Sequence, residues 1–202
     1  MPDFSLEEAL HNAGYRVVCG IDEAGRGPLS GHVIAAACVL PEGVEIEGLN
    51  DSKKLTPKKR EKLFDLITEV ALDYAIGYAT AEEIDRINIL NATMLAMRRA
   101  LEGLSTPADF ALVDGNCTRD FPIPAKAVIK GDSLSASIAA ASILAKVTRD
   151  RMCLVDHEKY PQYGFDKHKG YGTKEHMDAV RKYGPCPIHR RTFLKFLEEE
   201  QG

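Results

Sequence analysis

Apolar residues gather into five short runs with the length of β-strands, at residues 15–21, 33–40, 72–79, 110–114 and 126–130. Each run is bounded by Gly, Pro or charged residues, a pattern typical of buried strands. Only a short glycine-rich loop separates the first two runs, which favours an antiparallel pair. Segments that carry helix signals separate the runs at 33–40, 72–79 and 110–114 from one another. The pattern therefore predicts an α/β fold in which helices pack on a mixed sheet.

The segments between these runs carry signals for the start and the end of helices. Thr80 and Glu83 have the spacing of a capping box, which marks the beginning of a helix. Asp132 or Ser133 is expected to cap the longest helix. The predicted helices lie within residues 1–14, 57–70, 80–103, 134–160 and 173–183, with a last short helix from about residue 192.

The composition is that of a globular protein without a membrane segment. No stretch approaches the roughly 20 apolar residues that a span requires. The acidic first ten residues lack the apolar region of a signal peptide, so we expect a cytoplasmic location. We also expect the protein to be a monomer. Five scattered cysteines form no CxxC pair and are expected to be reduced. His168, His176 and His189 lack metal-ligand spacing and are interpreted as polar surface or phosphate contacts rather than a zinc site.

Charge is unevenly distributed along the chain. The net charge is −4, but residues 146–195 hold seven Lys and five Arg against four Asp and two Glu, a local net charge of +6. Pro161 and Gly164 interrupt the chain within this basic section. We predict a core over residues 1–160 and a basic helical extension over 161–202 that contacts substrate, because such a surface suits a phosphate backbone.

Acidic residues lie at the expected ends of three predicted strands. Asp22 and Glu23 follow the first run, Asp114 ends the fourth, and Asp132 comes just after the fifth. If these strands are neighbours, the four carboxylates converge at one edge of the sheet. Clustered acids hold hard divalent ions such as Mg²⁺, and two such ions about 3.5–4 Å apart support phosphodiester cleavage. Each acid alone is also typical of a turn or a cap, so the hypothesis depends on their combination.

Several polar side chains are candidates for contacts to substrate phosphates. Ser142 and Lys146 are four residues apart on the predicted long helix and therefore share a face. Lys146 is directed either toward substrate phosphate or the acid cluster, or else along the surface, where its stem covers the helix. Lys53 and Lys54 are phosphate contacts or simply charges of a polar loop.

Seven short segments resemble, in order, one known family. They are Gly20-Ile-Asp-Glu-Ala-Gly-Arg-Gly-Pro-Leu-Ser-Gly31, Asp51-Ser-Lys-Lys-Leu55, Val113-Asp-Gly115, Lys130-Gly-Asp132, Ala141-Ser-Ile-Leu-Ala-Lys-Val-Thr-Arg-Asp150, His168-Lys-Gly-Tyr-Gly-Thr173 and Pro187-Ile-His-Arg190. Together they resemble bacterial type 2 ribonuclease H, ribonuclease HII, over residues 16–196. The resemblance implies a ribonuclease H-like mixed sheet flanked by helices, with a small C-terminal helical extension.

The resemblance also implies an activity. Asp22, Glu23, Asp114 and Asp132 would be the catalytic quartet that binds Mg²⁺ or Mn²⁺. The substrate would be an RNA–DNA hybrid or a DNA duplex that contains single ribonucleotides. Cleavage would fall on the 5′ side of the ribonucleotide and leave a 3′-hydroxyl and a 5′-phosphate.

Two further motifs gain a role from the same resemblance. Gly25, Arg26 and Gly27 match a turn whose backbone meets the 2′-hydroxyl and phosphate, and Tyr171 matches a tyrosine that stacks on the next sugar. Only the 2′-hydroxyl distinguishes RNA from DNA at one nucleotide, and glycine lets backbone approach it without a Cβ. Two flanking glycines leave the ring of Tyr171 open for stacking. Tyr163 is a second candidate for that role.

Two other classes of function fit the residues themselves. One is a nucleic-acid-binding module without catalysis, in which the acids are structural. The other is a small-molecule phosphohydrolase that uses the same metals, although the basic C-terminal section argues against it. A duplex with one embedded ribonucleotide separates an enzyme from a binder, because only an enzyme produces new ends.

Overall fold

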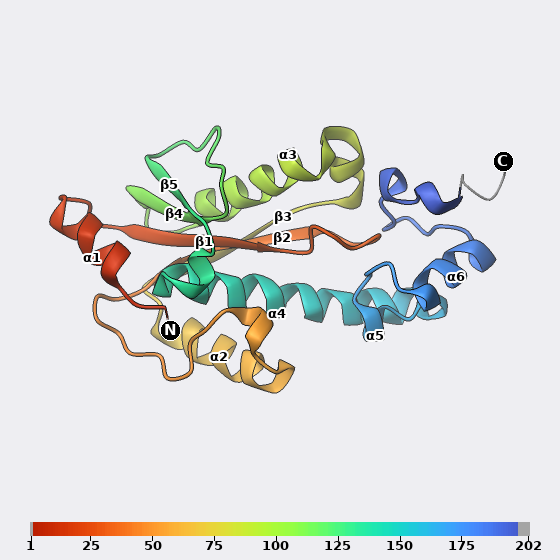
Figure 1. Ribbon diagram of the computed structural model, residues 1–202, viewed down its shortest axis with the longest axis horizontal. Coiled ribbons are helices and arrows are strands. Elements are labelled where there is room, and N and C mark those ends of the chain that lie inside the picture. Colours follow the sequence, from red (N-terminus) through yellow and green to blue (C-terminus); the bar gives the residue numbers. More distant parts are fainter. Residues whose placement is uncertain (1, 198–202) are drawn as a thin grey trace.

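The computed structural model describes residues 2–197 and contains a five-stranded sheet between helical layers (Figure 1). The strand order is β3-β2-β1-β4-β5. β1 pairs antiparallel with β2, and β2 antiparallel with β3, whereas β1, β4 and β5 are parallel. The predicted α/β class and the antiparallel first pair are confirmed. The strands are β1 (Val18–Ala24), β2 (Val33–Val39), β3 (Asp73–Ala79), β4 (Phe110–Asp114) and β5 (Ala125–Val128).

Helix α3 covers one face of the sheet and α4 covers the other, with α2 packed against α4 (Figure 1). The α-helices are α1 (Ser5–Asn12), α2 (Pro57–Val70), α3 (Ala81–Glu102), α4 (Ala136–Lys159), α5 (Phe165–His168) and α6 (Lys174–Tyr183). Short 3₁₀ turns lie at Ser52–Lys54, Gly131–Ser133, Pro161–Tyr163, Arg191–Phe193 and Lys195–Leu197. No helix within residues 2–197 is long and apolar enough to cross a membrane.

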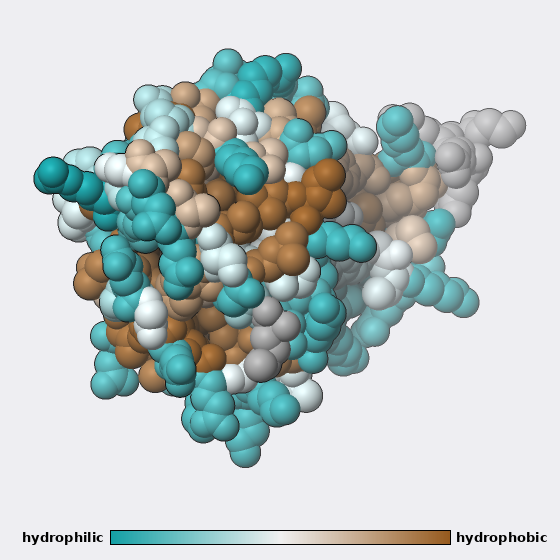
Figure 2. Space-filling model, turned by 60° about the vertical axis from the view of Figure 1, so that its left-hand side comes forward, coloured by the Kyte–Doolittle hydropathy of each residue, from teal (hydrophilic) through white to brown (hydrophobic). Residues whose placement is uncertain are grey.

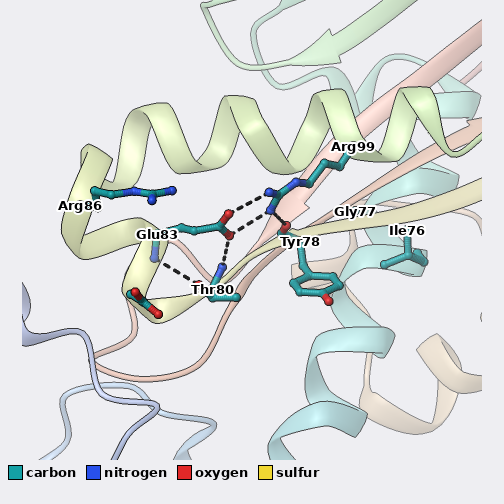
Figure 3. A pocket seen from close by; sticks show the side chains of 8 residues that line it. Ile76, Gly77, Tyr78, Thr80, Glu83, Arg86 and Arg99 are labelled. Carbon is teal, nitrogen blue, oxygen red and sulfur yellow. Dashed lines mark hydrogen bonds and ion pairs between the residues drawn. The ribbon is translucent and has the colours of Figure 1, made fainter.

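The predicted capping box at the start of α3 also joins this helix to the edge strand β3 (Figure 3). The backbone N–H of Glu83 donates to the Thr80 hydroxyl, and the N–H of Thr80 donates to the Glu83 carboxylate. Arg99, four turns further along α3, donates to both oxygens of that carboxylate and to the carbonyl of Tyr78. Arg99 therefore ties α3 to the backbone of β3 as well as to the helix start.

Side chains of β1 alternate between the two helical layers. Cys19 and Ile21 belong to the apolar cluster under α3, whereas Gly20 faces α4. A Cβ at Gly20 would lie 2.1 Å from the backbone carbon of Ser137 in α4. Because side chains repeat every two residues along a strand, Asp22 also faces the α4 side. Glycine at position 20 thus permits the close approach of α4 to the strand that carries Asp22.

Two predicted boundaries are wrong, and both errors affect the acidic residues. The first strand was predicted to end before Asp22, but β1 continues to Ala24 because pairing with β2 extends to Ala24 and Ile34. Backbone pairing does not require apolar side chains, so the change from apolar to acidic residues at Asp22 does not mark the end of the strand. The long helix begins at Ala136 and is capped by Ser135, whose hydroxyl accepts from the N–H of Ile138. Asp132 is thereby left outside the helix.

The chain after α4 folds as a small unit against the end of that helix (Figure 1). It has a small apolar cluster of its own, formed by Tyr163, Phe165, Val180, Cys186 and Leu194. The short helix predicted near Thr192 is a pair of 3₁₀ turns. In the predicted extension, residues 198–202 lie outside the described residues. On the face shown in Figure 2, hydrophilic residues line the rim and apolar residues gather toward the middle.

We predict that Gly20→Ala destabilises the protein by about 3 kcal/mol or more, because the added methyl group meets α4 backbone that cannot move aside. The control is Gly14→Ala, at a position with open space around it and a φ of +100°. That variant is expected to lose only about 1 kcal/mol, from backbone strain alone. Urea denaturation measures both values. Equal losses would contradict a close β1–α4 contact at position 20.

Candidate active site

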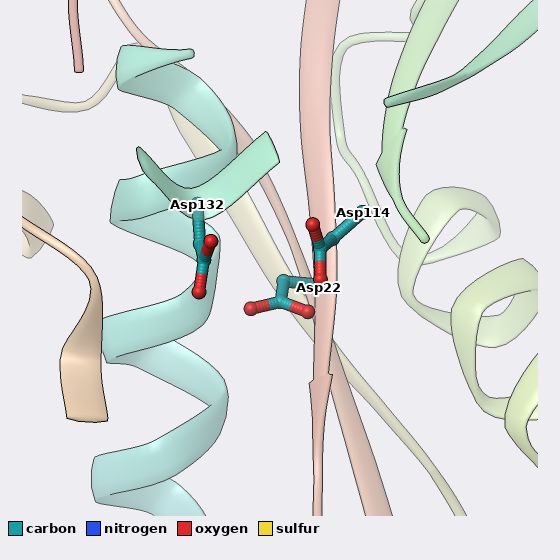
Figure 4. A group of neighbouring side chains, drawn as sticks. All are labelled: Asp22, Asp114 and Asp132. Atoms are coloured by element: carbon teal, nitrogen blue, oxygen red, sulfur yellow. The ribbon is translucent and has the colours of Figure 1, made fainter. Parts of the chain in front are cut away.

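Three aspartates from separate elements meet at the α4 face of the sheet (Figure 4). Asp22 comes from β1, Asp114 from the last position of β4, and Asp132 from the 3₁₀ turn before α4. One carboxylate oxygen of each lies within 4.8 Å of the others. The parallel register places Ile21 beside Val113, so the residues that follow them are also neighbours. Two buried carboxylates, Asp22 and Asp132, and the half-buried Asp114 thus share one site.

Local hydrogen bonds hold each carboxylate in place. Asp114 accepts a hydrogen bond of 2.6 Å from the backbone N–H of Gly131, which ties the turn carrying Asp132 to the end of β4. Asp22 accepts from the N–H of Glu23 at 2.7 Å and from the hydroxyl of Ser142 on α4. The Ser142 hydroxyl lies 2.9 Å from the Ser52 hydroxyl. These contacts fix the carboxylates although they repel one another.

The electrostatics of the three aspartates favour a bound cation. Burial raises the pKa of Asp22 well above its usual value, and the charges of Glu23 and Asp114 add to this rise. Burial also raises the pKa of Asp132, together with the charge of Asp114. The ammonium of Lys53 is 3.8 Å from Asp132 but is mostly exposed. Clustered oxygen donors with unneutralised negative charge fit a hard divalent cation, so these residues form an acidic metal-binding triad.

Glu23, the fourth predicted carboxylate, is outside this group of three. It is the next residue after Asp22 along β1, near the end of the strand. Its carboxylate lies 3.5 Å from the guanidinium of Arg26. Burial raises the pKa of Glu23, Arg26 opposes the rise, and the charge of Asp114 adds to it. Glu23 is therefore electrostatically linked to the triad without direct convergence on it.

The predicted glycine turn and Tyr171 lie next to each other. Gly25 has a φ of +94°, and a Cβ there would overlap the side chain of Arg149. A Cβ at Gly27 would lie 3.7 Å from the ring of Tyr171. The guanidinium of Arg149 lies over the same ring, 5.7 Å from its centroid. Tyr171 remains 46% exposed, so its ring is available to a ligand beside the turn.

The predicted phosphate contacts occupy different places. Lys53 is beside the triad, and Ser142 is buried behind Asp22. The ammonium of Lys146 is paired with Asp150, one turn further along α4, at 2.7 Å. Lys54 pairs with Asp51 at 3.8 Å. The structure therefore groups Lys53 and Ser142 with the aspartates and directs Lys146 along the helix.

The interpretation of the histidines as surface groups is wrong for two of them. His176 and His189 are buried, with 3.0 Å between their Nε2 atoms. Tyr163 is also buried, and its hydroxyl donates to the carbonyl of Gly184, so it is not available for stacking on a ligand. Sequence reasoning singled out neither Arg149 nor Arg190, whose side chains are buried beside the glycine turn. Arginine in a polar segment gives no local signal of burial.

Comparisons with known proteins agree with this fold and site. The family model for ribonuclease HII matches residues 19–196. A ribonuclease HII from Syntrophotalea carbinolica is 56% identical over 188 residues, which cover 93% of this chain and 90% of that protein. The crystal structure of ribonuclease H2 from Pyrococcus horikoshii OT3 matches with a TM-score of 0.74 and 31% identity, over 92% of this chain and 98% of that one.

A more distant structure, Bst-RNase HIII in complex with Mn²⁺, shares the fold at 19% identity and a TM-score of 0.62. The match covers 87% of this chain and 65% of that one. The mixed sheet and its acidic triad define a metal-dependent endonuclease with the ribonuclease H architecture. The chain belongs to the ribonuclease HII family, the endoribonucleases that cleave RNA in RNA–DNA hybrids.

We predict that Asp22→Asn raises the melting temperature by several degrees at pH 7 in the presence of EDTA. The raised pKa of Asp22 means that its ionisation destabilises the folded state, and asparagine removes this charge. The advantage should shrink as the pH falls through the raised pKa toward the ordinary value of 3.8, because wild type then gains the proton. Thermal unfolding across pH measures this.

Asp65→Asn, at an exposed position of α2, is the matched control and should leave the melting temperature unchanged. Addition of Mn²⁺ should stabilise wild type and this control more than Asp22→Asn. If Asp22→Asn is instead the less stable protein in EDTA at neutral pH, its carboxylate does not carry an unfavourable buried charge.

Proposed function

We propose that this chain cuts the phosphodiester bond on the 5′ side of a ribonucleotide, both in RNA–DNA hybrids and at single ribonucleotides within duplex DNA. The products are a 3′-hydroxyl and a 5′-phosphate. One observation carries the proposal: this chain has both the aspartate triad and a glycine turn that lies against the exposed ring of Tyr171. A metal site beside a sugar-recognition surface is what selective cleavage at a ribonucleotide requires.

Asp22, Asp114 and Asp132 are the residues that hold the divalent ions, with Glu23 as the fourth acid. The cation is Mg²⁺ or Mn²⁺, which the all-oxygen donor set and the Mn²⁺ complex of Bst-RNase HIII support. When bound, a pair of such ions activates water and stabilises the leaving oxygen. The hydrogen bond from Gly131 to Asp114 keeps two of the acids oriented for this task.

Gly25, Arg26 and Gly27 form the surface that recognises the 2′-hydroxyl and its phosphate. Tyr171 stacks on the following sugar and thereby requires it to be deoxyribose. The proximity of Gly27 to the ring of Tyr171 supports this division, because one ribonucleotide and the next sugar are neighbours in the substrate. Ser142 supports this site from behind by orienting Asp22.

The phosphate backbone follows the basic side of the molecule. Lys53 is exposed beside Asp132 and is placed to contact a phosphate near the cleaved bond. Lys146 lines a surface cavity between α2, α4 and α5 in which the cations outnumber the acids. Its other cationic residues are Arg60, Arg151, Lys167 and Lys169, and its acidic residues are Glu61, Asp150 and Asp166. We assign this cavity and the extension from residue 161 to the backbone of the duplex.

The same chain supplies the triad, the turn and Tyr171, so the proposed reaction does not need a second copy and the enzyme acts as a monomer. Free cysteines suit the reducing conditions of the cytoplasm, which is the proposed location. Neither proposal requires a partner other than the nucleic acid and the divalent ion.

The decisive assay uses a DNA duplex with one ribonucleotide, incubated with Mg²⁺ or Mn²⁺. We predict a cut at its 5′ side and none in all-DNA duplex. Asp114→Asn should lower the rate about 1,000-fold or more because the metal loses a ligand. Asp65→Asn should retain full activity. A shifted but intact band for wild type would identify a binder, and full activity of Asp114→Asn would remove this residue from the site.

A separate prediction concerns Tyr171. Tyr171→Ala should lower kcat/KM for the single-ribonucleotide duplex about 10–100-fold, which corresponds to one lost stacking contact. Tyr171→Phe should retain most of the activity because the ring is preserved. Tyr74→Ala, at an exposed tyrosine of the distant edge strand β3, is the control. Equal activity of Tyr171→Ala and the control would exclude stacking as its role.

A further inference from the structure

Arg190 is a fully buried arginine whose side chain hydrogen-bonds to backbone carbonyls of the glycine-rich loop. Its Nε donates to the carbonyl of Gly31 at 3.0 Å, and its Nη2 to that of Gly25 at 2.6 Å. Its Nη1 donates to the carbonyls of Arg26 and Pro28, at 2.9 and 2.8 Å. One guanidinium thus holds four carbonyls of a single loop. No carboxylate is among these acceptors.

The backbone around Arg190 is joined to the same loop. The N–H of Arg190 donates to the carbonyl of Leu29, and the N–H of Gly31 donates to the carbonyl of Ile188, both at 2.9 Å. Figure 1 shows the corresponding C-terminal segment beside the loop that connects β1 and β2. The loop is therefore held by the C-terminal extension through both backbone and side chain, although the residues are far apart in sequence.

These contacts determine which way the peptide groups of the turn face. In a trans peptide unit the C=O of one residue and the N–H of the next point in opposite directions. The carbonyls of Gly25 and Arg26 point at Arg190, so the N–H groups of Arg26 and Gly27 point away from it. Within residues 2–197 neither N–H has a hydrogen-bond partner. Successive free N–H groups of this kind form a nest for an anionic or electron-rich oxygen.

We infer that Arg190 is the positioning residue of the sugar-recognition turn, because it holds the turn's carbonyls and so presents the N–H groups of Arg26 and Gly27 to an oxygen of the ribonucleotide. This inference rests on the proposed function and adds a residue from the C-terminal extension to it. Arg190 touches neither substrate nor metal. It acts through the backbone of the turn.

The chemistry of arginine suits this role better than that of lysine. A guanidinium presents five N–H donors in a fixed plane, whereas an ammonium presents three donors around one atom. Burial lowers the pKa of Arg190 to about 9, with a smaller contribution from the charge of Arg149. The guanidinium is still protonated at neutral pH, so all of its donors are available there. A lysine at this position would not reach four carbonyls at once.

The test compares two duplexes that differ at one sugar. One carries a single ribonucleotide, and the other carries a 2′-fluoro-2′-deoxyribonucleotide at the same place, whose fluorine accepts a hydrogen bond from an N–H group far more weakly than the hydroxyl oxygen does. Arg190→Lys is compared with Arg86→Ala, which removes an exposed arginine of α3 outside the proposed substrate surface. We expect Arg190→Lys to lower kcat on the ribonucleotide duplex about 100-fold, with a smaller change in KM. The rate ratio between the two duplexes should also fall, whereas Arg86→Ala should change neither kcat nor the ratio.

The ratio separates positioning from a general effect on folding. A smaller folded fraction lowers both rates by the same factor and leaves their ratio unchanged. Arg190→Gln, which is uncharged and keeps two N–H donors, should also lower the ratio, and Mn²⁺ affinity measured by titration should stay at the wild-type value in both variants. If the ratio of the two rates is unchanged in Arg190→Lys and Arg190→Gln, the inference about Arg190 is wrong, whereas the proposed function is unaffected. A wild-type chain that cuts neither duplex would overturn the proposed function and this inference together.

Discussion

Mutual repulsion among three carboxylates is the constraint around which this fold is built. Asp22, Asp114 and Asp132 approach within 4.8 Å of one another, and burial makes their charges more costly. The approach is enforced by the parallel pairing of β1 with β4 and by the close packing of α4 on Gly20. A divalent cation relieves the repulsion, so the same geometry that is unfavourable in the metal-free protein becomes a binding site.

In the proposed function, substrate recognition depends on a different junction, between the sheet and the C-terminal extension. The glycine turn belongs to the loop after β1, whereas Tyr171 and Arg190 belong to the extension. The N–H of Leu29 donates to the carbonyl of Gly170 at 2.8 Å, which joins the two parts next to the tyrosine. The buried pair of His176 and His189 helps to pack the extension on which these residues lie. The extension is thus joined to the loop after β1, and under the proposed function it is part of the site.

Much of the fold follows from the sequence because apolar runs and caps are local signals. The five strands, the capping box at Thr80 and the long helix were predicted near their observed positions. The end of β1 was predicted too early, because the backbone hydrogen bonds between β1 and β2 continue through Asp22 and Glu23 although both residues are charged.

The residues that support the site are much harder to predict than the acids themselves. Arg190 contacts a loop 159 to 165 positions earlier in the chain, and no spacing rule connects them. His176 and His189 resemble surface histidines until tertiary contacts bury them together. Carboxylates at strand ends are recognisable from sequence because their chemistry is unusual there, whereas a buried positioning residue acquires its role only from packing.

The most direct test of the account is the location of Mn²⁺ by anomalous diffraction from crystals of the wild-type protein grown with the ion. The account predicts an anomalous peak about 2.1 Å from carboxylate oxygens of Asp22, Asp114 and Asp132. A well-ordered triad with no peak beside it, while Mn²⁺ is bound elsewhere on the chain, would contradict the claim that these three acids form the metal site.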